Sequence, residues 1–150
     1  MSADDHAAAR EAAIRLLARR EYAVADLRAR LEQRDHEPAI ADAVVAELAE
    51  ERLVSDERFA EAFVNSRVER GQGPMKIGAE LRQRGVEPAL ADPHLEAVDW
   101  VEQARAAYQH RFGNAEPPAD YRERAKRMRF LQQRGFTAEQ VRRVVGEDDD

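Results

Sequence analysis

The sequence contains no cysteine, which excludes disulfide bonds, thiolate catalysis and thiolate metal ligands. Aromatic residues make up only 6% of the 150 residues, and runs of β-branched residues are absent, which argues against a β-sheet. No apolar run approaches the length of a membrane-spanning helix, and the acidic start MSADDHAAAR is unlike a secretory leader. We therefore expect a soluble, helical protein of the cytoplasm that makes no membrane contact.

Signatures of catalysis and of cofactor binding are missing too. The segment Gly71-Gln72-Gly73-Pro74 lacks the spacing of a phosphate-binding loop and is better explained as a turn between helices. The acids Glu47, Glu50 and Glu51 are expected on a solvated helix face rather than in a cleft. Four histidines are scattered without metal-ligand spacing: His6, His36, His94 and His110. We expect a protein that is not an enzyme and needs no cofactor or metal.

The central segment, Leu53 to Gly85, predicts two helices joined by a glycine–proline turn. Ser55 is a good N-cap, and Asp56 places negative charge in the first turn, where the helix dipole favours it. The turn at Gly73 separates the helices, and Gly85 is suited to the left-handed conformation that ends the second one. The inward stripes predicted for these helices contain Phe59, Ala60, Phe63, Val64, Arg67, Ile77 and Leu81. We interpret the two phenylalanines as core residues, with partner contact as the alternative.

Part of this segment recurs with a period of 50 residues. The run LRQRG at Leu81–Gly85 has counterparts in LEQRD at Leu31–Asp35 and in LQQRG at Leu131–Gly135. Helix-start signals follow in register: a proline after each of the first two copies, and a Thr-x-x-Gln capping box after the third. A fixed period, with helix-end and helix-start signals at the same place in each copy, predicts a tandem repeat of one supersecondary unit. The alternative is chance similarity among helices rich in Arg and Glu.

Helical periodicity extends this pattern over the chain. We predict an all-α fold of three tandem three-helix repeats, at 7–51, 55–97 and 99–146, forming an elongated, curved array. A disordered tail at 1–6 and an acidic tail at 147–150 flank the repeats. In two of the helices the following apolar residues are expected to face inward: Ile14, Leu16, Leu17 and Ala18 in 7–19, and Tyr121, Ala125, Met128 and Leu131 in 121–134.

Residues 88–111 allow more than one arrangement. Pro93 falls inside a helix that begins at Pro88, so it is expected to kink or split that helix near Asp92, which then caps a new segment. Asp99 resembles the N-cap of the following helix. Apolar spacing from Leu95 onward continues through that cap, so one long fused helix is the alternative.

Charge is distributed unevenly along the chain, although its net value is −6. Residues 35–51 hold six acids and no Lys or Arg. Residues 67–84 hold five basic residues and two acids, and residues 121–145 hold eight basic residues and two acids. The second helices of the last two repeats are therefore basic, which predicts contact with phosphates or with an acidic protein surface.

Eight cations on these basic segments are candidate partner-binding residues: Arg67, Lys76, Arg82, Arg84, Arg122, Lys126, Arg129 and Arg134. The first four are equally well explained as a solvated face that makes weak ion pairs. The other four, Arg122, Lys126, Arg129 and Arg134, form a stripe with i, i+4, i+7 spacing, and Arg142 and Arg143 are nearby. Contact with phosphate or with an acidic protein is the better explanation for this stripe.

The run LVSDERFAEAFV at 53–64 and the pattern R-x-x-x-G-x-G-P-x-K-I-x-x-E-L-R-x-R-G-V at 67–86 resemble the core of the RecX regulatory proteins. The final LQQRGF, at 131–136, is similar to their last repeat, so the resemblance covers about 11–146. One departure is Asp35, where the family usually has glycine. The residues that carry the structural motif on this resemblance are Asp56, Phe59, Phe63, Gly73, Leu81, Gly85 and Gly135.

The resemblance implies a monomeric modulator of the bacterial RecA recombinase, acting in DNA repair, recombination and the SOS response. It implies binding along the groove of the RecA–single-stranded-DNA filament and suppression of strand exchange, ATP hydrolysis and coprotease activity. The runner-up function is a stand-alone nucleic-acid binder, because each three-helix unit is similar to a helix-turn-helix. A helical adaptor with an unrelated partner is a third possibility.

Overall fold

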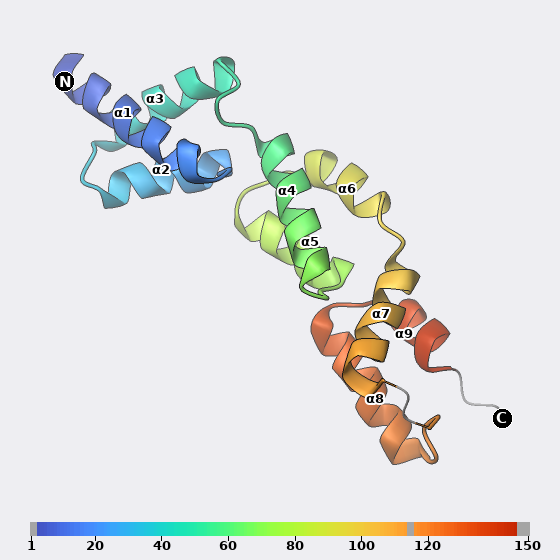
Figure 1. Cartoon of the computed structure of the whole chain (residues 1–150). Coiled ribbons are helices and arrows are strands. Elements are labelled where there is room, and N and C mark those ends of the chain that lie inside the picture. The colour runs from blue at the N-terminus through green and yellow to red at the C-terminus, as the bar shows by residue number, and fades with distance from the viewer. Residues whose placement is uncertain (1–2, 114–115, 147–150) are drawn as a thin grey trace. The chain divides into compact units, whose positions relative to one another are not determined.

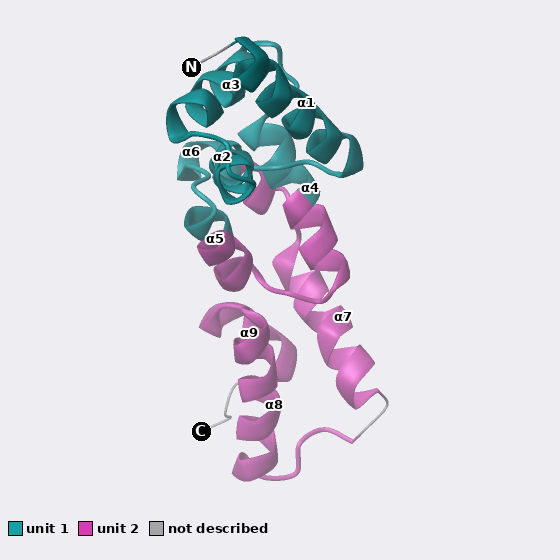
Figure 2. Ribbon diagram, turned by 90° about the vertical axis from the view of Figure 1, so that its left-hand side faces the viewer, with its two compact units in different colours: residues 1–62, 81–91 teal, residues 63–80, 92–150 magenta. Residues whose placement is uncertain are grey.

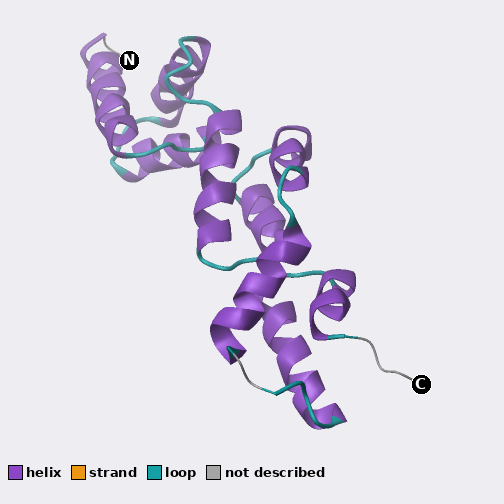
Figure 3. Ribbon diagram, turned by 45° about the vertical axis from the view of Figure 1, so that its right-hand side comes forward, coloured by secondary structure: helices purple, strands orange, loops and turns teal. Residues whose placement is uncertain are grey.

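The computed structural model describes residues 3–113 and 116–146, and within these ranges it contains nine α-helices and no strand (Figures 1 and 3). The helices are α1 (Ala3–Arg19), α2 (Val24–Gln33), α3 (Pro38–Glu50), α4 (Asp56–Glu69), α5 (Pro74–Gln83), α6 (Pro88–Glu96), α7 (Trp100–Phe112), α8 (Tyr121–Arg134) and α9 (Ala138–Val145). The predicted all-α class is confirmed. In its described part the chain has no helix long and apolar enough to span a membrane.

The chain divides into two compact units, Met1–Ala62 with Leu81–Ala91, and Phe63–Glu80 with Asp92–Asp150 (Figure 2). The division passes through α4, α5 and α6, so the middle group of helices contributes to both units. Each unit therefore contains at least one place where neighbouring three-helix groups meet. The repeat bounds predicted from the sequence, 7–51, 55–97 and 99–146, stay a prediction.

In the first unit, α1 packs on α3 through small residues. The buried face of α1 is formed by Ala9, Ala13 and Leu16, which lets the two helices approach closely. Ile14 is 42% exposed and Ala18 is also exposed, so the prediction that these two residues face inward was wrong.

The first helix also begins earlier than predicted. It starts at Ala3, so residues 3–6 are helical rather than a disordered tail, and Met1 and Ser2 lie outside the described residues. Asp4 and Asp5 stand in its first turn, where negative charge stabilises the helix dipole.

Two acidic residues at the C-terminal end of α3 form ion pairs with an arginine of α1. Arg10 Nη1 lies 2.7 Å from Glu47 Oε1 and 2.7 Å from Glu51 Oε2, and His6 Nε2 lies 2.9 Å from Glu47 Oε2. The hydrogen bond from Arg10 lowers the pKa of the Glu51 carboxyl. The Glu47 and Glu51 side chains remain 42% and 44% exposed, which agrees with the predicted solvated face. The guanidinium that α1 brings over them was not predicted.

Most capping signals read from the sequence are confirmed. Ser55 Oγ accepts a hydrogen bond from the Arg58 backbone N–H at 3.2 Å, and Thr137 and Gln140 form a reciprocal capping box at the start of α9. Asp120, a cap that sequence reasoning missed, precedes α8 and accepts from the Glu123 N–H at 2.9 Å. These caps satisfy backbone donors that have no partner inside their own helix.

The turn after each second helix is left-handed. The φ angle is +70° at Asp35, +83° at Gly85 and +104° at Gly135. In each turn the N–H of the following residue reaches back to the carbonyl of the repeated leucine, at 3.0 to 3.2 Å. The 50-residue sequence repeat thus corresponds to one recurring helix end.

The predicted break at Pro93 does not occur. Helix α6 is continuous from Pro88 to Glu96 with the proline inside it, so Asp92 does not cap a new helix. A proline removes only one backbone hydrogen bond and the helix ends three residues later, so little structure depends on the lost bond. Asp99 then caps α7 by accepting from the Glu102 N–H at 3.1 Å, which also makes the fused-helix alternative wrong.

Candidate partner-binding surface

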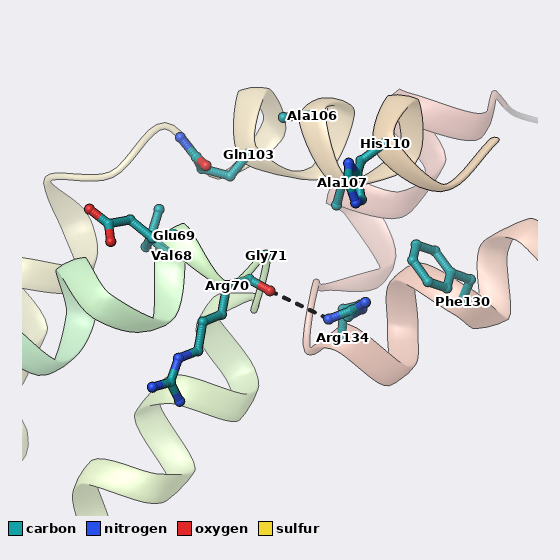
Figure 4. Close-up of a pocket in the computed structure, with 10 residues that line it drawn as sticks. All are labelled: Val68, Glu69, Arg70, Gly71, Gln103, Ala106, Ala107, His110, Phe130 and Arg134. Carbon is teal, nitrogen blue, oxygen red and sulfur yellow. Dashed lines mark hydrogen bonds between the residues drawn. The ribbon is translucent and has the colours of Figure 1, made fainter. Parts of the chain in front are cut away.

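Three of the eight candidate cations are engaged inside the molecule. Arg67 Nη1 lies 3.2 Å from Glu80 Oε1, and its side chain is only 18% exposed. Arg84 Nη1 lies 3.1 Å from Asp26 Oδ2. Arg134 Nη1 donates to the Arg70 carbonyl oxygen at 3.4 Å, as Figure 4 shows. These three side chains hold neighbouring helices together, which reduces what they can offer to a partner.

The other five candidates are exposed: Lys76, Arg82, Arg122, Lys126 and Arg129. Within the described ranges, 3–113 and 116–146, none of the five side chains forms an ion pair. An exposed cation without a carboxylate partner is free to bind an external anion, since no existing ion pair has to be broken.

The exposed face of α8 carries no acidic residue. Its exposed members, which we call the α8 face, are Tyr121, Arg122, Lys126, Arg129, Gln132 and Gln133. The single acid of the helix, Glu123, is half-buried and lies 3.0 Å from the guanidinium of Arg127. This face is strongly positive in a chain whose net charge is −6. Tyr121 is 77% exposed, so its predicted inward position was wrong.

Arg127 is buried, with 6% exposure, and sequence reasoning missed it. Its Nη1 donates to the Tyr108 hydroxyl at 2.7 Å and its Nε donates to Glu123 Oε1 at 3.0 Å. The hydrogen bond with Tyr108 raises the pKa of the guanidinium, so it remains charged. The 50-residue register contained the signal, because position 127 corresponds to Leu27 and Ile77, both fully buried.

A close contact between two turns joins α5 to α8 in the second unit. The Gly73 N–H donates to the Arg134 carbonyl at 2.7 Å, and the Met75 N–H donates to the Gly135 carbonyl at 2.9 Å. A Cβ on Gly73 would lie 2.4 Å from the Gly135 carbonyl carbon, so only glycine fits. The first turn of α5 thereby satisfies the last carbonyls of α8.

The first unit contains a related contact between α2 and the turn after α5. A Cβ on Gly85 would lie 3.1 Å from Ala25 Cβ, and the Arg84–Asp26 ion pair spans the same place. We call both contacts second-helix joints, each formed by the first turn of one second helix and the left-handed turn after the next. Asp56 supports this joint, since its Oδ1 accepts from the Val24 N–H at 2.8 Å. Asp56 therefore caps α2, a role that its predicted effect on the dipole of its own helix did not include.

A pocket of about 580 Å³ lies beside the joint of the second unit (Figure 4). Phe130 and Arg134 of α8 line it together with residues of α7 and the end of α4. The guanidinium of Arg134 lies 5.2 Å from the centre of the Phe130 ring. Its complete lining is Val68, Glu69, Arg70, Gly71, Gln103, Ala106, Ala107, His110, Phe130 and Arg134. No group of three or more potential metal ligands occurs in the described part of the chain.

Comparison with known proteins assigns the family. Models of the first, second and third three-helix domains of RecX match residues 9–48, 55–95 and 97–145 of this chain. The chain belongs to the RecX family. This membership confirms the resemblance found in the sequence, and it identifies the three groups of helices as the three RecX three-helix domains.

Close relatives in the RecX family align with more than nine-tenths of the chain. The regulatory protein RecX of Halorhodospira halophila is 52% identical over 145 residues, which cover 95% of this chain and 89% of the relative. The regulatory protein RecX of Chromohalobacter salexigens is 51% identical over 138 residues, covering 91% of this chain and 90% of the relative. A RecX-type regulatory role is therefore the appropriate class of function.

Two crystal structures of RecX proteins have the same fold. RecX from Lactobacillus salivarius superimposes with a TM-score of 0.82 at 21% identity, covering 96% of both chains. A second structure, of a regulatory protein RecX, gives 0.83 at 20% identity and covers 95% of this chain and 73% of the other. At such low identity the likeness concerns the fold alone, and it agrees with the all-α arrangement described above.

Proposed function

We propose that this chain binds the RecA–single-stranded-DNA filament and inhibits strand exchange, ATP hydrolysis and coprotease activity. It acts in the cytoplasm as a monomer and catalyses no reaction itself. The relatives named regulatory protein RecX support the regulatory class. The observation that carries the proposal is the α8 face, a row of cations without an acid on a protein of net charge −6.

Contact with a nucleoprotein filament suits exposed cations that have no internal partner. Phosphate contacts release condensed counterions, so each one contributes a salt-dependent share of the affinity. Weak contacts made by linked repeats add up, since the second contact of one chain is intramolecular once the first has formed. A chain held along the filament groove in this way would exclude a second DNA and so suppress strand exchange.

Co-sedimentation tests this proposal. The chain is mixed with RecA filaments assembled on single-stranded DNA, with naked DNA and RecA alone as parallel samples, and the same mixtures are assayed for ATP hydrolysis. We expect the chain to pellet with the filament and to slow hydrolysis at physiological salt. Pelleting that is equal on naked DNA would favour a stand-alone nucleic-acid binder. Absence from all the pellets would contradict the proposal.

A matched pair of triple variants tests the surface. One variant carries Arg122→Ala, Lys126→Ala and Arg129→Ala, and is expected to inhibit less because three exposed charges are lost from one face. The control carries Arg19→Ala, Arg30→Ala and Arg34→Ala, which are also exposed and form no ion pair within the described ranges. Both changes lower the net charge equally. Equal inhibition by the two variants would show that the α8 face is not the contact surface.

A further inference from the structure

Helix α8 begins one turn earlier than the second helices of the other two repeats. Helix α2 starts seven residues before its repeated leucine and α5 likewise, whereas α8 starts ten residues before Leu131. The extra turn is Tyr121 to Glu123, and it begins at its own N-cap, Asp120. This turn is an addition to the repeat, so the packing shared by the three units does not explain it.

Of the three added residues, only one makes a contact among the residues that the structure describes. Glu123 is half-buried and pairs with Arg127, while Arg122 is exposed and Tyr121 is 77% exposed. A tyrosine contributes a large apolar ring, and leaving that ring in water forgoes the stabilisation of burying it. The added turn therefore extends the α8 face outward with an aromatic ring next to a cation.

The composition of the α8 face matches the chemistry of single-stranded nucleic acid. At about 1.5 Å per residue, the face runs for about 18 Å along the helix. Proteins that hold single strands combine a positive track for the phosphates with an aromatic side chain on which a base stacks. Glutamine carboxamides, here Gln132 and Gln133, can donate and accept hydrogen bonds at base edges.

An acidic protein surface fits this face less well. Carboxylates on a protein are interspersed with cations and apolar groups, so recognition of them does not require a face free of acid over its whole length. A phosphate backbone is uniformly negative, and any carboxylate on the face would repel it. An exposed aromatic ring does not improve binding to carboxylates, whereas stacking of one base on it strengthens binding about 5- to 150-fold.

We propose that the α8 face binds single-stranded nucleic acid directly, with Arg122, Lys126 and Arg129 on phosphates and Tyr121 stacked on a base. This inference rests on the proposed function, because it names the DNA strand of the filament as the ligand of α8. To the proposed function it adds a defined class of ligand. It also adds a binding residue, Tyr121, that the charge pattern does not identify.

Fluorescence anisotropy with a labelled oligothymidylate, measured at several salt concentrations on the full chain, tests this assignment. We expect Tyr121→Ala to weaken binding about 5- to 150-fold, the factor that corresponds to one lost stacking contact, with an unchanged salt slope. Tyr121→Phe should bind like the parent, since the ring is kept. The triple variant of Arg122, Lys126 and Arg129 should instead flatten the salt slope by about two units, at about 0.7 per phosphate contact on a single strand.

Two controls separate stacking from damage to the fold and from nonspecific charge effects. An abasic strand with the same phosphates should bind the parent and Tyr121→Ala equally, because it has no base to stack. The triple variant of Arg19, Arg30 and Arg34 should keep the parental salt slope, and circular dichroism should show parental helicity for every variant.

The outcomes distinguish this inference from the proposed function. Loss of filament inhibition in the Arg122, Lys126 and Arg129 variant, with oligonucleotide binding undetectable in the parent, would overturn direct nucleic-acid contact and leave filament binding intact. Oligonucleotide binding that depends on Tyr121, without inhibition of the filament by the parent, would support the contact and refute the proposed function. Equal oligonucleotide affinity of the parent, Tyr121→Ala and the triple variant would overturn the inference directly.

Discussion

The buried guanidinium of Arg127 offers a sharp test of how the third group of helices is stabilised. Its position in the repeat holds Leu27 in the first copy and Ile77 in the second, and both are fully buried. We therefore compare Arg127→Ala, which empties the site, with Arg127→Leu, which restores the aliphatic residue of the other copies. The two variants remove the same charge and the same hydrogen bonds, so they differ only in how well they fill the space.

The expected magnitudes follow from the contacts of Arg127. A hydrogen bond to a charged group contributes about 1.5–3 kcal/mol, and Arg127 makes two, with Tyr108 and Glu123. The Glu123 side chain is 36% exposed, so water can replace part of its contact and its share is discounted. Arg127→Ala should then lose about 3 kcal/mol, and Tm should fall by about 6–12 °C for a chain of this size.

Arg127→Leu loses the same hydrogen bonds, but burying its aliphatic side chain returns about 1.5–3 kcal/mol, so its stability should stay within about 1 kcal/mol of the parent. Thermal and urea unfolding of the full chain, followed by circular dichroism, measure both variants. The raised pKa of Arg127 keeps it charged in the folded chain, and a raised pKa of a cation stabilises at every pH below its unfolded pKa. The stability difference between the parent and each variant should therefore be constant from about pH 5 to 9. The reasoning fails if Arg127→Leu is as unstable as Arg127→Ala.

Three further predictions concern the joint at Gly73, the cap formed by Asp56 and the ion pair of Glu51. Gly73→Ala should cost about 1–3 kcal/mol in chemical unfolding, because its new Cβ meets backbone at 2.4 Å. Gly71→Ala, at φ +79° with nothing within 4 Å, should cost only its left-handed strain and should leave amide protection at the start of α5 unchanged. Asp56→Ala should lose about 0.5–2 kcal/mol of stability in urea while Asp56→Asn keeps most of it, and equal losses would mean that the acceptor for the Val24 N–H is unimportant. Because the pKa of Glu51 is lowered, its stabilisation is present above the ordinary Glu value of 4.5 and disappears as pH falls through the folded value. The Tm difference between the parent and Glu51→Gln should accordingly vanish in acid, and a difference that persists there would contradict this account.

Local signals in the sequence predicted the helices well because caps and turns depend on neighbouring residues. The left-handed turn at Gly85 and the capping box at Thr137 involve contacts within a few residues, so composition and spacing suffice to find them. The continuous helix through Pro93 was missed because a proline inside a helix is destabilising but does not always end the helix. Here it removes one backbone hydrogen bond close to the helix end, where few other contacts depend on it.

Contacts between distant segments were beyond the reach of periodicity. Asp56 caps a helix that begins 32 residues earlier, and Arg10 reaches carboxylates 37 and 41 residues away. Within α8 the predicted inward stripe was right for Leu131 and wrong for Tyr121, and it left out Arg127, which is buried. Comparison of the three copies position by position would have found Arg127, because the buried site is shared even though its residue is not.

The second-helix joints also limit growth of the chain into polymers. In the second unit a Cβ on Gly135 would lie 2.6 Å from Lys76 Cβ, so the turn that enters a joint of this kind has room for glycine only. The corresponding turn of the first repeat carries Asp35, at φ +70° and with a full side chain. Head-to-tail addition would bring the first turn of another molecule's α8, which takes part in neither joint, to this turn. That molecule would meet the Asp35 side chain where a joint has glycine, so the substitution at this one position disfavours addition of a further chain.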